Sequence, residues 1–281
     1  MIVLSYGGGT DSTALLVEAH RRSIRPDLIV WADTGSERPE TYAYLPIIGK
    51  WLADRGWPAI ETVRWIRQDG RFVPLHEACL AHNDLPSAAY GHAGCSSKWK
   101  RQPLDKYIDK HPAVVAALAA GQVVERWIGY NADEDARVAN LPTLNTMLAV
   151  EPDQQVYLFG GSAAVQPPLA LRATPYQWKA KLYEWGVDRE EARQIIQCAG
   201  LPLPGKSACF VCPHSSVGEV KDLRRKHPTL FATALQIEAG AELTAVAGLG
   251  RTWKWSDVDR QALLFDGVHR DEADIPCGCS T

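Results

Sequence analysis

The sequence predicts an α/β protein with a doubly wound parallel sheet and a smaller, mainly helical C-terminal part that carries cysteines. Short, almost wholly apolar runs alternate with helical patterns through the first half, which is typical of strands covered on both faces. A Cys-x-x-Cys pair lies near residue 210, beyond this alternation. We therefore expect about five strands, an α/β domain over residues 1–200 and a helical region over residues 201–281.

The elements of the first half follow from local patterns. Apolar runs of four or five residues indicate strands, and longer runs with helical periodicity indicate helices. The expected strands are residues 2–5, 28–31, 60–64 and 123–130, and the expected helices are residues 13–20, 44–55 and 100–110.

The second half is less regular. Residues 141–174 are weakly patterned and rich in proline, which indicates a loop or insertion. Residues 176–199 are expected to be mostly helical, with a break at Gly186 before Asp188, an N-cap residue followed by two acidic residues. After a turn at residues 201–205, residues 217–239 are expected to form one helix.

Composition and charge exclude several classes of protein. The 281 residues include 30 Lys and Arg against 33 Asp and Glu, a net charge of −3, and 46% are hydrophobic, which excludes disorder as the main state. No apolar stretch approaches about 18 residues without a charge, so we expect no membrane partner. The N-terminus lacks the basic segment of a signal peptide, so we expect a cytoplasmic protein. There the seven cysteines would more often serve metals, clusters or reactive thiols than disulfides.

A glycine-rich stretch, Ser-Tyr-Gly-Gly-Gly-Thr-Asp-Ser, separates the first strand from the first helix; we call residues 5–12 the glycine loop. Glycines let the backbone approach a ligand closely, and the N–H groups at a helix start attract phosphate. A plain turn with a capped helix is the alternative. The loop matches neither the Walker A nor the dinucleotide pattern. The expected nucleotide-binding residues are Ser5, Gly7, Gly8, Gly9, Thr10 and Ser12.

The string S-x-G-G-x-D-S resembles the pyrophosphate (PP) loop of the ATP-pyrophosphatase superfamily, also called adenine nucleotide alpha hydrolases. The resemblance implies the fold of that superfamily, cleavage of ATP between its α and β phosphates, and adenylation of a substrate or binding of an adenylyl-sulfate. It also implies that Asp11 and Ser12 take part in catalysis and that Mg²⁺ bridges the phosphates, through Asp11 or Asp33.

Three further stretches resemble the phosphoadenylyl-sulfate (PAPS) reductase family, and residues 204–214 resemble a segment of its uncharacterised phage and bacterial members. The three stretches are Asp33-Thr34-Gly35 with Pro39-Glu40-Thr41, residues 94–98 with Pro103-Leu104, and residues 128–137. Asp33, Thr34 and Gly35 are expected to bind the nucleotide, because Asp33 ends a strand. A turn residue that caps the next helix is the alternative for Asp33. The resemblance implies anion contacts for Lys98 and Arg137; an exposed, solvated surface is the alternative for both.

The cysteines leave three readings open. Cys209 and Cys212 form a C-x-x-C, which serves a metal, an iron–sulfur cluster or a redox pair. The family resemblance adds Cys95 as a third ligand of a [4Fe–4S] cluster with one open iron. A structural zinc site that includes His214 is the second reading, and packed or free thiols are the third. Cys79 is expected to be a buried apolar residue.

The C-terminal Cys277-Gly278-Cys279 faintly resembles the stretch that holds the nucleophilic cysteine of these reductases, although the flanking Glu and His are missing. The resemblance makes Cys277 a candidate catalytic thiol, and a frayed tail is the alternative.

Basic residues 221–227, with those between 98 and 110, indicate a local groove for DNA or tRNA; a solvated helix face is the alternative. Trp253 and Trp255 are candidates for base stacking or for the core. Together these features favour an ATP-dependent enzyme that couples adenylation to sulfur transfer. The alternatives are a PAPS or adenylyl-sulfate reductase and a non-enzymatic nucleotide sensor. Self-association into a homo-oligomer stays open.

Overall fold

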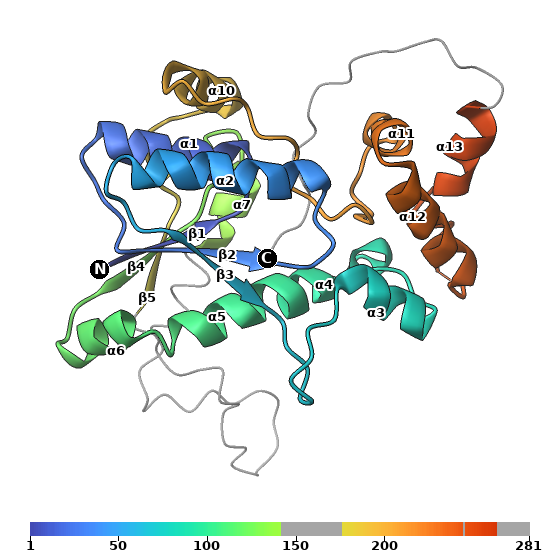
Figure 1. Ribbon diagram of the computed structural model, residues 1–281, viewed down its shortest axis with the longest axis horizontal. Helices are drawn as coiled ribbons and strands as arrows, with labels where there is room; N and C mark the ends of the chain where they lie inside the picture. Colours follow the sequence, from blue (N-terminus) through green and yellow to red (C-terminus); the bar gives the residue numbers. More distant parts are fainter. Residues whose placement is uncertain (142–175, 244, 263–281) are drawn as a thin grey trace, which may run out of the picture. The chain divides into compact units, whose positions relative to one another are not determined.

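The computed structural model describes residues 1–141, 176–243 and 245–262. It contains a five-stranded parallel sheet in the order β3-β2-β1-β4-β5 (Figure 1). The α/β class and the number of strands are therefore as expected. The strands are β1 (Ile2–Tyr6), β2 (Leu28–Asp33), β3 (Ile60–Arg64), β4 (Val124–Trp127) and β5 (Tyr176–Lys179).

The prediction that residues 176–199 are mostly helical is confirmed by two helices in this segment, but its first four residues form the fifth strand instead. Val124 pairs with Tyr176 and Trp127 pairs with Lys179, so Tyr176–Lys179 extends the sheet in parallel beside β4. Two aromatic residues in four favour a strand, and the pairing with β4 decides the conformation of so short a segment. The helices α9 (Lys181–Glu184) and α10 (Arg189–Cys198) follow.

The chain groups into two compact units. The first unit takes residues 1–30, 47–61 and 108–203, and the second takes residues 31–46, 62–107 and 204–281. The predicted division at residue 200 stays a prediction; the nearest unit boundary follows Leu203.

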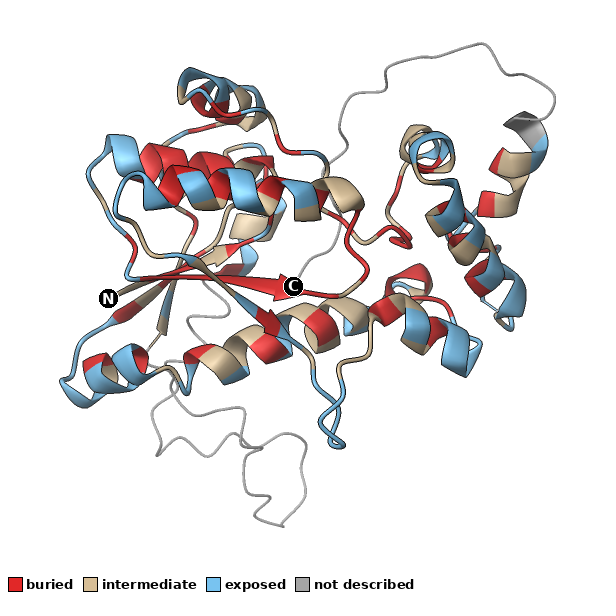
Figure 2. Cartoon of the chain, in the orientation of Figure 1, coloured by how far each residue is buried: buried red, intermediate tan, exposed pale blue. Residues whose placement is uncertain are grey.

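The first unit is built around α1 (Thr10–Arg21), which is buried along most of its length (Figure 2). Ala192, Ile195 and Ile196 recur on one face of α10 and are buried, and this helix packs against α1. The predicted N-cap at Asp188 is confirmed: its carboxylate accepts from the Glu191 N–H, and the Glu191 carboxylate accepts from the Asp188 N–H, a capping box. These contacts fix where α10 begins relative to α1.

The remaining helices of the first half lie between β2 and β5 in the sequence. Buried Val114 and Ala117 are on α6, which contacts β4. These helices are α2 (Pro39–Ala53), α3 (Leu75–His82), α4 (Gly94–Ser96), α5 (Gln102–Ile108), α6 (Pro112–Ala119) and α7 (Asp135–Val138), with a 3₁₀ turn at Ser87–Tyr90 and a π-helical turn at Ser97–Arg101.

In the second unit, helices α11 (Val217–Lys226), α12 (Pro228–Gly240) and α13 (Trp255–Ala262) share a core with α3. The prediction of one helix over residues 217–239 is wrong, because the chain breaks at His227. Proline lacks an N–H and disfavours the helical conformation in the residue before it, and His227 has φ −136° and ψ 65°. Pro228 therefore accounts for the break between α11 and α12.

The loop before α13 is held by one buried carboxylate. Glu238 on α12 accepts hydrogen bonds from the N–H groups of Leu249, Trp255 and Ser256 at 2.8, 2.8 and 3.0 Å. Trp255 has no exposed surface and stacks on Trp253, so it belongs to the core rather than to a base-stacking surface.

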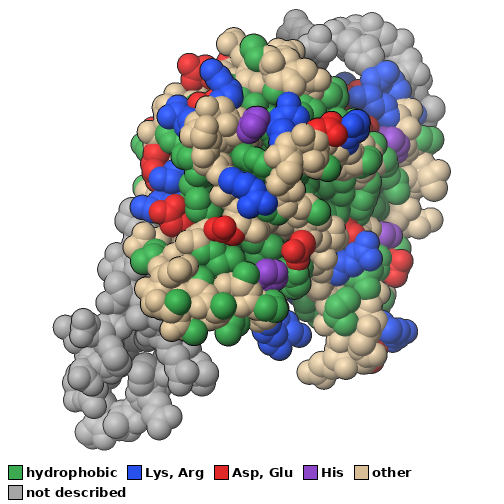
Figure 3. Space-filling model, turned by 60° about the vertical axis from the view of Figure 1, so that its left-hand side comes forward, with side chains coloured by type: hydrophobic (Ala, Val, Ile, Leu, Met, Phe, Trp, Pro, Cys, Tyr) green, Lys and Arg blue, Asp and Glu red, His purple; other side chains and the backbone are tan. Residues whose placement is uncertain are grey.

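The basic cluster of α11 is interleaved with acids. Arg224 pairs with Asp259 at 2.8 Å, and Asp222 pairs with both Arg225 and Lys226. On the face drawn in Figure 3, Lys and Arg side chains likewise alternate with Asp and Glu. Binding of DNA or tRNA stays a prediction. No helix among the described residues has the length and apolar character to cross a membrane.

Candidate functional site

The glycine loop joins β1 to α1 and presents backbone donors. Gly8 has φ +76°, a conformation that favours glycine, and Gly9 is the N-cap of α1 in an extended conformation. No side chain caps this helix start, so its first N–H groups lack the usual side-chain acceptor among the described residues. Such a start is suited to an anion.

Hydroxyl groups surround the same turn. Ser12 Oγ donates to the Gly9 carbonyl at 3.2 Å, and Ser5 Oγ at the end of β1 is buried. Within the described part of the chain, the Ser5 hydroxyl has no hydrogen-bond partner. The structure thus brings the predicted residues Ser5, Gly7, Gly8, Gly9, Thr10 and Ser12 into one turn at the end of a central strand.

The glycine loop lies where the order of the sheet reverses. The chain runs from β1 to β2 and β3 on one side, and then continues with β4 on the other side of β1. The loops after β1 and β4 meet there: a Cβ at Gly129 would lie 2.9 Å from the Ser12 nitrogen. Doubly wound sheets bind ligands at this point, beyond the carboxyl ends of the strands.

Asp11 in the first turn of α1 is held from two sides. Asn131 Nδ2 donates to its Oδ1 at 3.1 Å, and Arg189 Nη1 donates to its Oδ2 at 2.6 Å. Burial raises the pKa of Asp11, and the positive charge of Arg189 partly opposes that shift. Sequence reasoning singled out Asp11 but missed both partners, which lie 120 and 178 residues away along the chain.

Arg137 belongs to the same unit and also has an acidic partner. Its guanidinium pairs with Glu134 and lies 4.2 Å from the centre of the Tyr130 ring. The second oxygen of Glu134 accepts from the Asn131 N–H at 3.2 Å, so Arg137 is linked through Glu134 to the residue that holds Asp11. A direct anion contact of Arg137 stays a prediction.

In the second unit, Asp33 ends β2 with almost no exposed surface. Its Oδ1 accepts from the Gly35 N–H at 2.8 Å and from the Tyr42 hydroxyl at 2.7 Å, while Arg64 binds Oδ2 at 2.8 Å. Burial and the Asp33 charge raise the pKa of Tyr42 far above its usual value. The hydrogen bond from the Gly35 N–H is typical of a turn residue, which is the alternative interpretation of Asp33. Nucleotide contacts of Asp33, Thr34 and Gly35 stay predictions.

The segment after Asp33 lies against the C-x-x-C. An antiparallel bridge joins Glu37 to Cys209, and the Phe210 N–H donates to the Ser36 carbonyl at 2.8 Å. Glu37 Oε1 accepts from Thr34 Oγ1 at 3.1 Å and from the Cys209 thiol at 3.6 Å. The Lys100 ammonium lies 2.9 Å from the same oxygen. The buried Glu37 carboxylate is therefore in contact with both the Cys209 thiol and the Lys100 ammonium.

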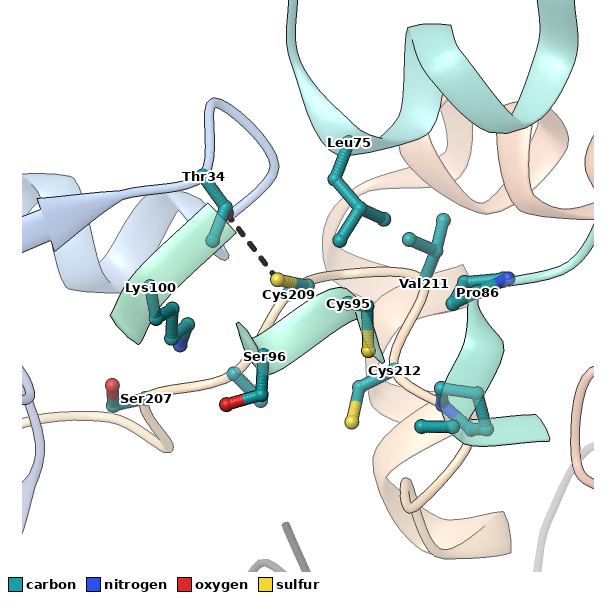
Figure 4. Close-up of a pocket in the computed structure, with 13 residues that line it drawn as sticks. Thr34, Leu75, Pro86, Cys95, Ser96, Lys100, Ser207, Cys209, Val211 and Cys212 are labelled. Atoms are coloured by element: carbon teal, nitrogen blue, oxygen red, sulfur yellow. Dashed lines mark hydrogen bonds between the residues drawn. The ribbon is translucent and has the colours of Figure 1, made fainter. Parts of the chain in front are cut away.

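Cys95, Cys209 and Cys212 line a single cavity of about 70 Å³, which we call the thiol pocket (Figure 4). Burial and the Glu37 charge raise the pKa of Cys209 well above its usual value, so this thiol is protonated and acts as a donor. The other lining residues are Thr34, Leu75, Pro86, Ala88, Ser96, Lys100, Ser207, Ala208, Val211 and Pro213.

The two nearby lysines have different positions. Lys100 lines the thiol pocket, whereas the ammonium of Lys98 lies 4.2 and 4.5 Å from the ring centres of Trp65 and Trp99. Lys98, for which an anion contact is predicted, is thus packed on two indoles, whereas the lysine at the pocket is Lys100. Both lysines lie in the π-helical turn at residues 97–101.

The three cysteines share a pocket without forming a metal-ligand set. Among the described residues, no group of three or more His, Cys, Asp or Glu side chains is placed to hold a metal ion. Cysteines bind metals as thiolates, and the negative charge of Glu37 disfavours the thiolate form of Cys209. The cluster and the zinc site stay predictions, and no step below depends on them. Cys79 is buried, as expected; Cys277 and Cys279 lie outside the described residues.

No protein-family model matches the chain, and no curated protein matches it.

Proposed function

We propose that the chain is an ATP-dependent enzyme of the ATP-pyrophosphatase type, similar to PAPS reductases, that adenylates a substrate and couples this step to sulfur transfer. The observation that carries the proposal is the uncapped start of α1, with its glycine loop, at the point where the strand order reverses between β1 and β4. The S-x-G-G-x-D-S string lies in this loop. Backbone donors there suit the phosphates of ATP or of an adenylyl-sulfate.

In this proposal the chain's own residues bind and orient the phosphates. The N–H groups of Thr10, Asp11 and Ser12 and the Ser12 hydroxyl bind the pyrophosphate end. Fixed dipoles of this kind stabilise the negative charge that grows on the leaving pyrophosphate as the bond from the α phosphorus to the bridging oxygen breaks. They need no reorganisation, because the glycine loop already holds them in place.

Mg²⁺ would partly neutralise the phosphate charge when it is bound. Of the two predicted ligands, Asp11 fits this role better. Each of its oxygens accepts one hydrogen bond from Asn131 or Arg189, which leaves lone pairs for a cation. Asp33 already accepts from Gly35, Tyr42 and Arg64.

The thiol pocket supports the sulfur half of the proposal. It offers three cysteines and, beside Cys209, the buried carboxylate of Glu37 as a proton acceptor. In the proposed reaction the terminal sulfur of a persulfide on a pocket cysteine, loaded by a persulfide donor, displaces AMP from the adenylated substrate and forms a cysteine–substrate disulfide. A second pocket cysteine attacks the cysteine sulfur of that disulfide and releases the thiolated substrate. The disulfide left between the two cysteines is reduced by an external thiol.

Release of pyrophosphate from ATP tests the proposal. We would incubate wild type, Ser12→Ala and Thr229→Ala with γ-labelled ATP and with RNA or DNA fragments as acceptors. Thr229 is exposed on α12, so its substitution is a matched loss of a hydroxyl. Labelled pyrophosphate from wild type and Thr229→Ala but not from Ser12→Ala is expected. Full activity of Ser12→Ala contradicts the proposal. Formation of sulfite from PAPS and a thiol reductant, without release of pyrophosphate from ATP, instead favours a reductase.

A further inference from the structure

The glycine loop lacks a positive charge of its own. Residues 5–12 include no Lys or Arg, and Asp11 adds a negative charge to the first turn of α1. The pyrophosphate end of a nucleotide carries several negative charges, and phosphate loops commonly use a basic side chain to offset them. If the loop binds phosphates, another part of the unit has to supply the cation.

Arg189 places a cation in contact with the glycine loop. Its Nη1 lies 2.6 Å from Asp11 Oδ2, and one third of its side chain is exposed. Among the described residues, Asp11 is the one hydrogen-bond acceptor of this guanidinium, which has five N–H donors in total. The guanidinium therefore has donors to offer a ligand at the same place.

The placement of Arg189 is costly for its own helix and is fixed by several contacts. It is the first residue of α10, where the helix dipole disfavours a cation. The capping box of Asp188 and Glu191 sets the preceding turn, and the Arg189 N–H donates to Asp133 Oδ2 at 3.0 Å. Because apolar residues of α10 already pack on α1, helix packing does not require an arginine here.

We propose that Arg189 is the phosphate-binding cation of the glycine loop, and that on binding of the pyrophosphate end of a nucleotide it exchanges Asp11 for the phosphate oxygens. Asp11 keeps its bond from Asn131 Nδ2 and becomes able to face a cation. Arg189 contacts Asp11 of the glycine loop directly, whereas Arg137 is paired with Glu134. The inference rests on the proposed function of the glycine loop and adds the residue that recognises the phosphates.

Calorimetric titration with inorganic pyrophosphate, ATP and adenosine tests the exchange. Arg189→Gln is expected to weaken binding of pyrophosphate and ATP by about 10- to 100-fold, the effect of one charge-assisted contact, and to leave adenosine binding unchanged. Arg193→Gln removes the same charge one turn further along α10 and is expected to change none of the three affinities.

Asp11→Asn separates an exchange from a merely structural ion pair. It removes a competitor for Arg189, so pyrophosphate is expected to bind more tightly in Mg²⁺-free buffer, even though ATP turnover with Mg²⁺ is lost. If Arg189→Gln does not fold, Asp11→Asn still tests the exchange. Unchanged affinities in Arg189→Gln, or weaker pyrophosphate binding in Asp11→Asn, overturn the inference alone. A wild-type protein that binds neither ATP nor pyrophosphate overturns the proposed function instead.

Discussion

The Lys100 ammonium lies 2.9 Å from the Glu37 carboxylate, which has no exposed side-chain surface. Lys98, two residues earlier, lies over the rings of Trp65 and Trp99 instead. The pair thus places a buried negative charge and its counter-ion beside the Cys209 thiol.

Replacement of each lysine by methionine should show that the two contribute differently to stability. Lys100→Met leaves the Glu37 charge buried without its cation, so we expect a loss of about 2 kcal/mol in the free energy of unfolding, less than for a fully buried pair because Lys100 is partly exposed. Lys98→Met removes a cation–π contact and should cost about 0.5–1 kcal/mol. Urea denaturation of both variants measures the difference, and a larger loss in Lys98→Met would contradict it.

Gly129 is predicted to be required for the meeting of the loops after β1 and β4. Gly129→Ala places a methyl group 2.9 Å from the Ser12 backbone nitrogen, so we expect a loss of about 1–3 kcal/mol of stability together with weaker ATP binding. Gly49→Ala, on α2, meets no atom within 4 Å and should be neutral or stabilise by up to about 1 kcal/mol. Equal behaviour of the two variants in thermal melts would contradict the close approach.

The thiols should differ in reactivity with pH. A thiol is alkylated as its thiolate, and burial raises the pKa of Cys79 to about 12 and that of Cys209 well above its usual value. At pH 8 both should react slowly with iodoacetamide, and the rate at Cys79 should rise as pH increases toward its pKa. Exposed Cys198 should react first. Peptide mass spectrometry gives the order, and alkylation of Cys209 as fast as Cys198 would show that its thiol is ionised.

Metal content tests the cysteine predictions independently. An iron–sulfur cluster predicts iron with matching acid-labile sulfide in protein purified without oxygen, and zinc without iron indicates a structural site. Either metal should fall in Cys212→Ser, because Cys212 lines the thiol pocket, and persist in Cys198→Ser, because exposed Cys198 is not among the residues that line it. Protein with neither iron nor zinc would leave the pocket as one of free thiols.

Local patterns predicted much of the fold. The strand–loop–helix at residues 2–21 and the N-cap at Asp188 depend on neighbouring residues, and both are present. The strand at Tyr176–Lys179 depends on pairing with β4, which no local pattern encodes. Pro228 is the local signal for the break between α11 and α12, and the prediction of one helix over residues 217–239 did not use it.

Most of the site could not be predicted, because its contacts join distant residues. Ser5–Ser12 is one continuous string, so its residues could be named in advance. Arg189 meets Asp11, and Glu37 meets Cys209, only after the chain folds, and both pairs are more than 170 residues apart in sequence.

Hydrogen–deuterium exchange of the glycine loop tests the central claim most directly. Saturating ATP should slow exchange of the backbone N–H groups in residues 7–13, because phosphate oxygens would accept from donors that no side chain caps. Exchange in α11 and α12 should stay the same. Unchanged exchange in residues 7–13 at saturating ATP would contradict the assignment of this loop as the nucleotide site.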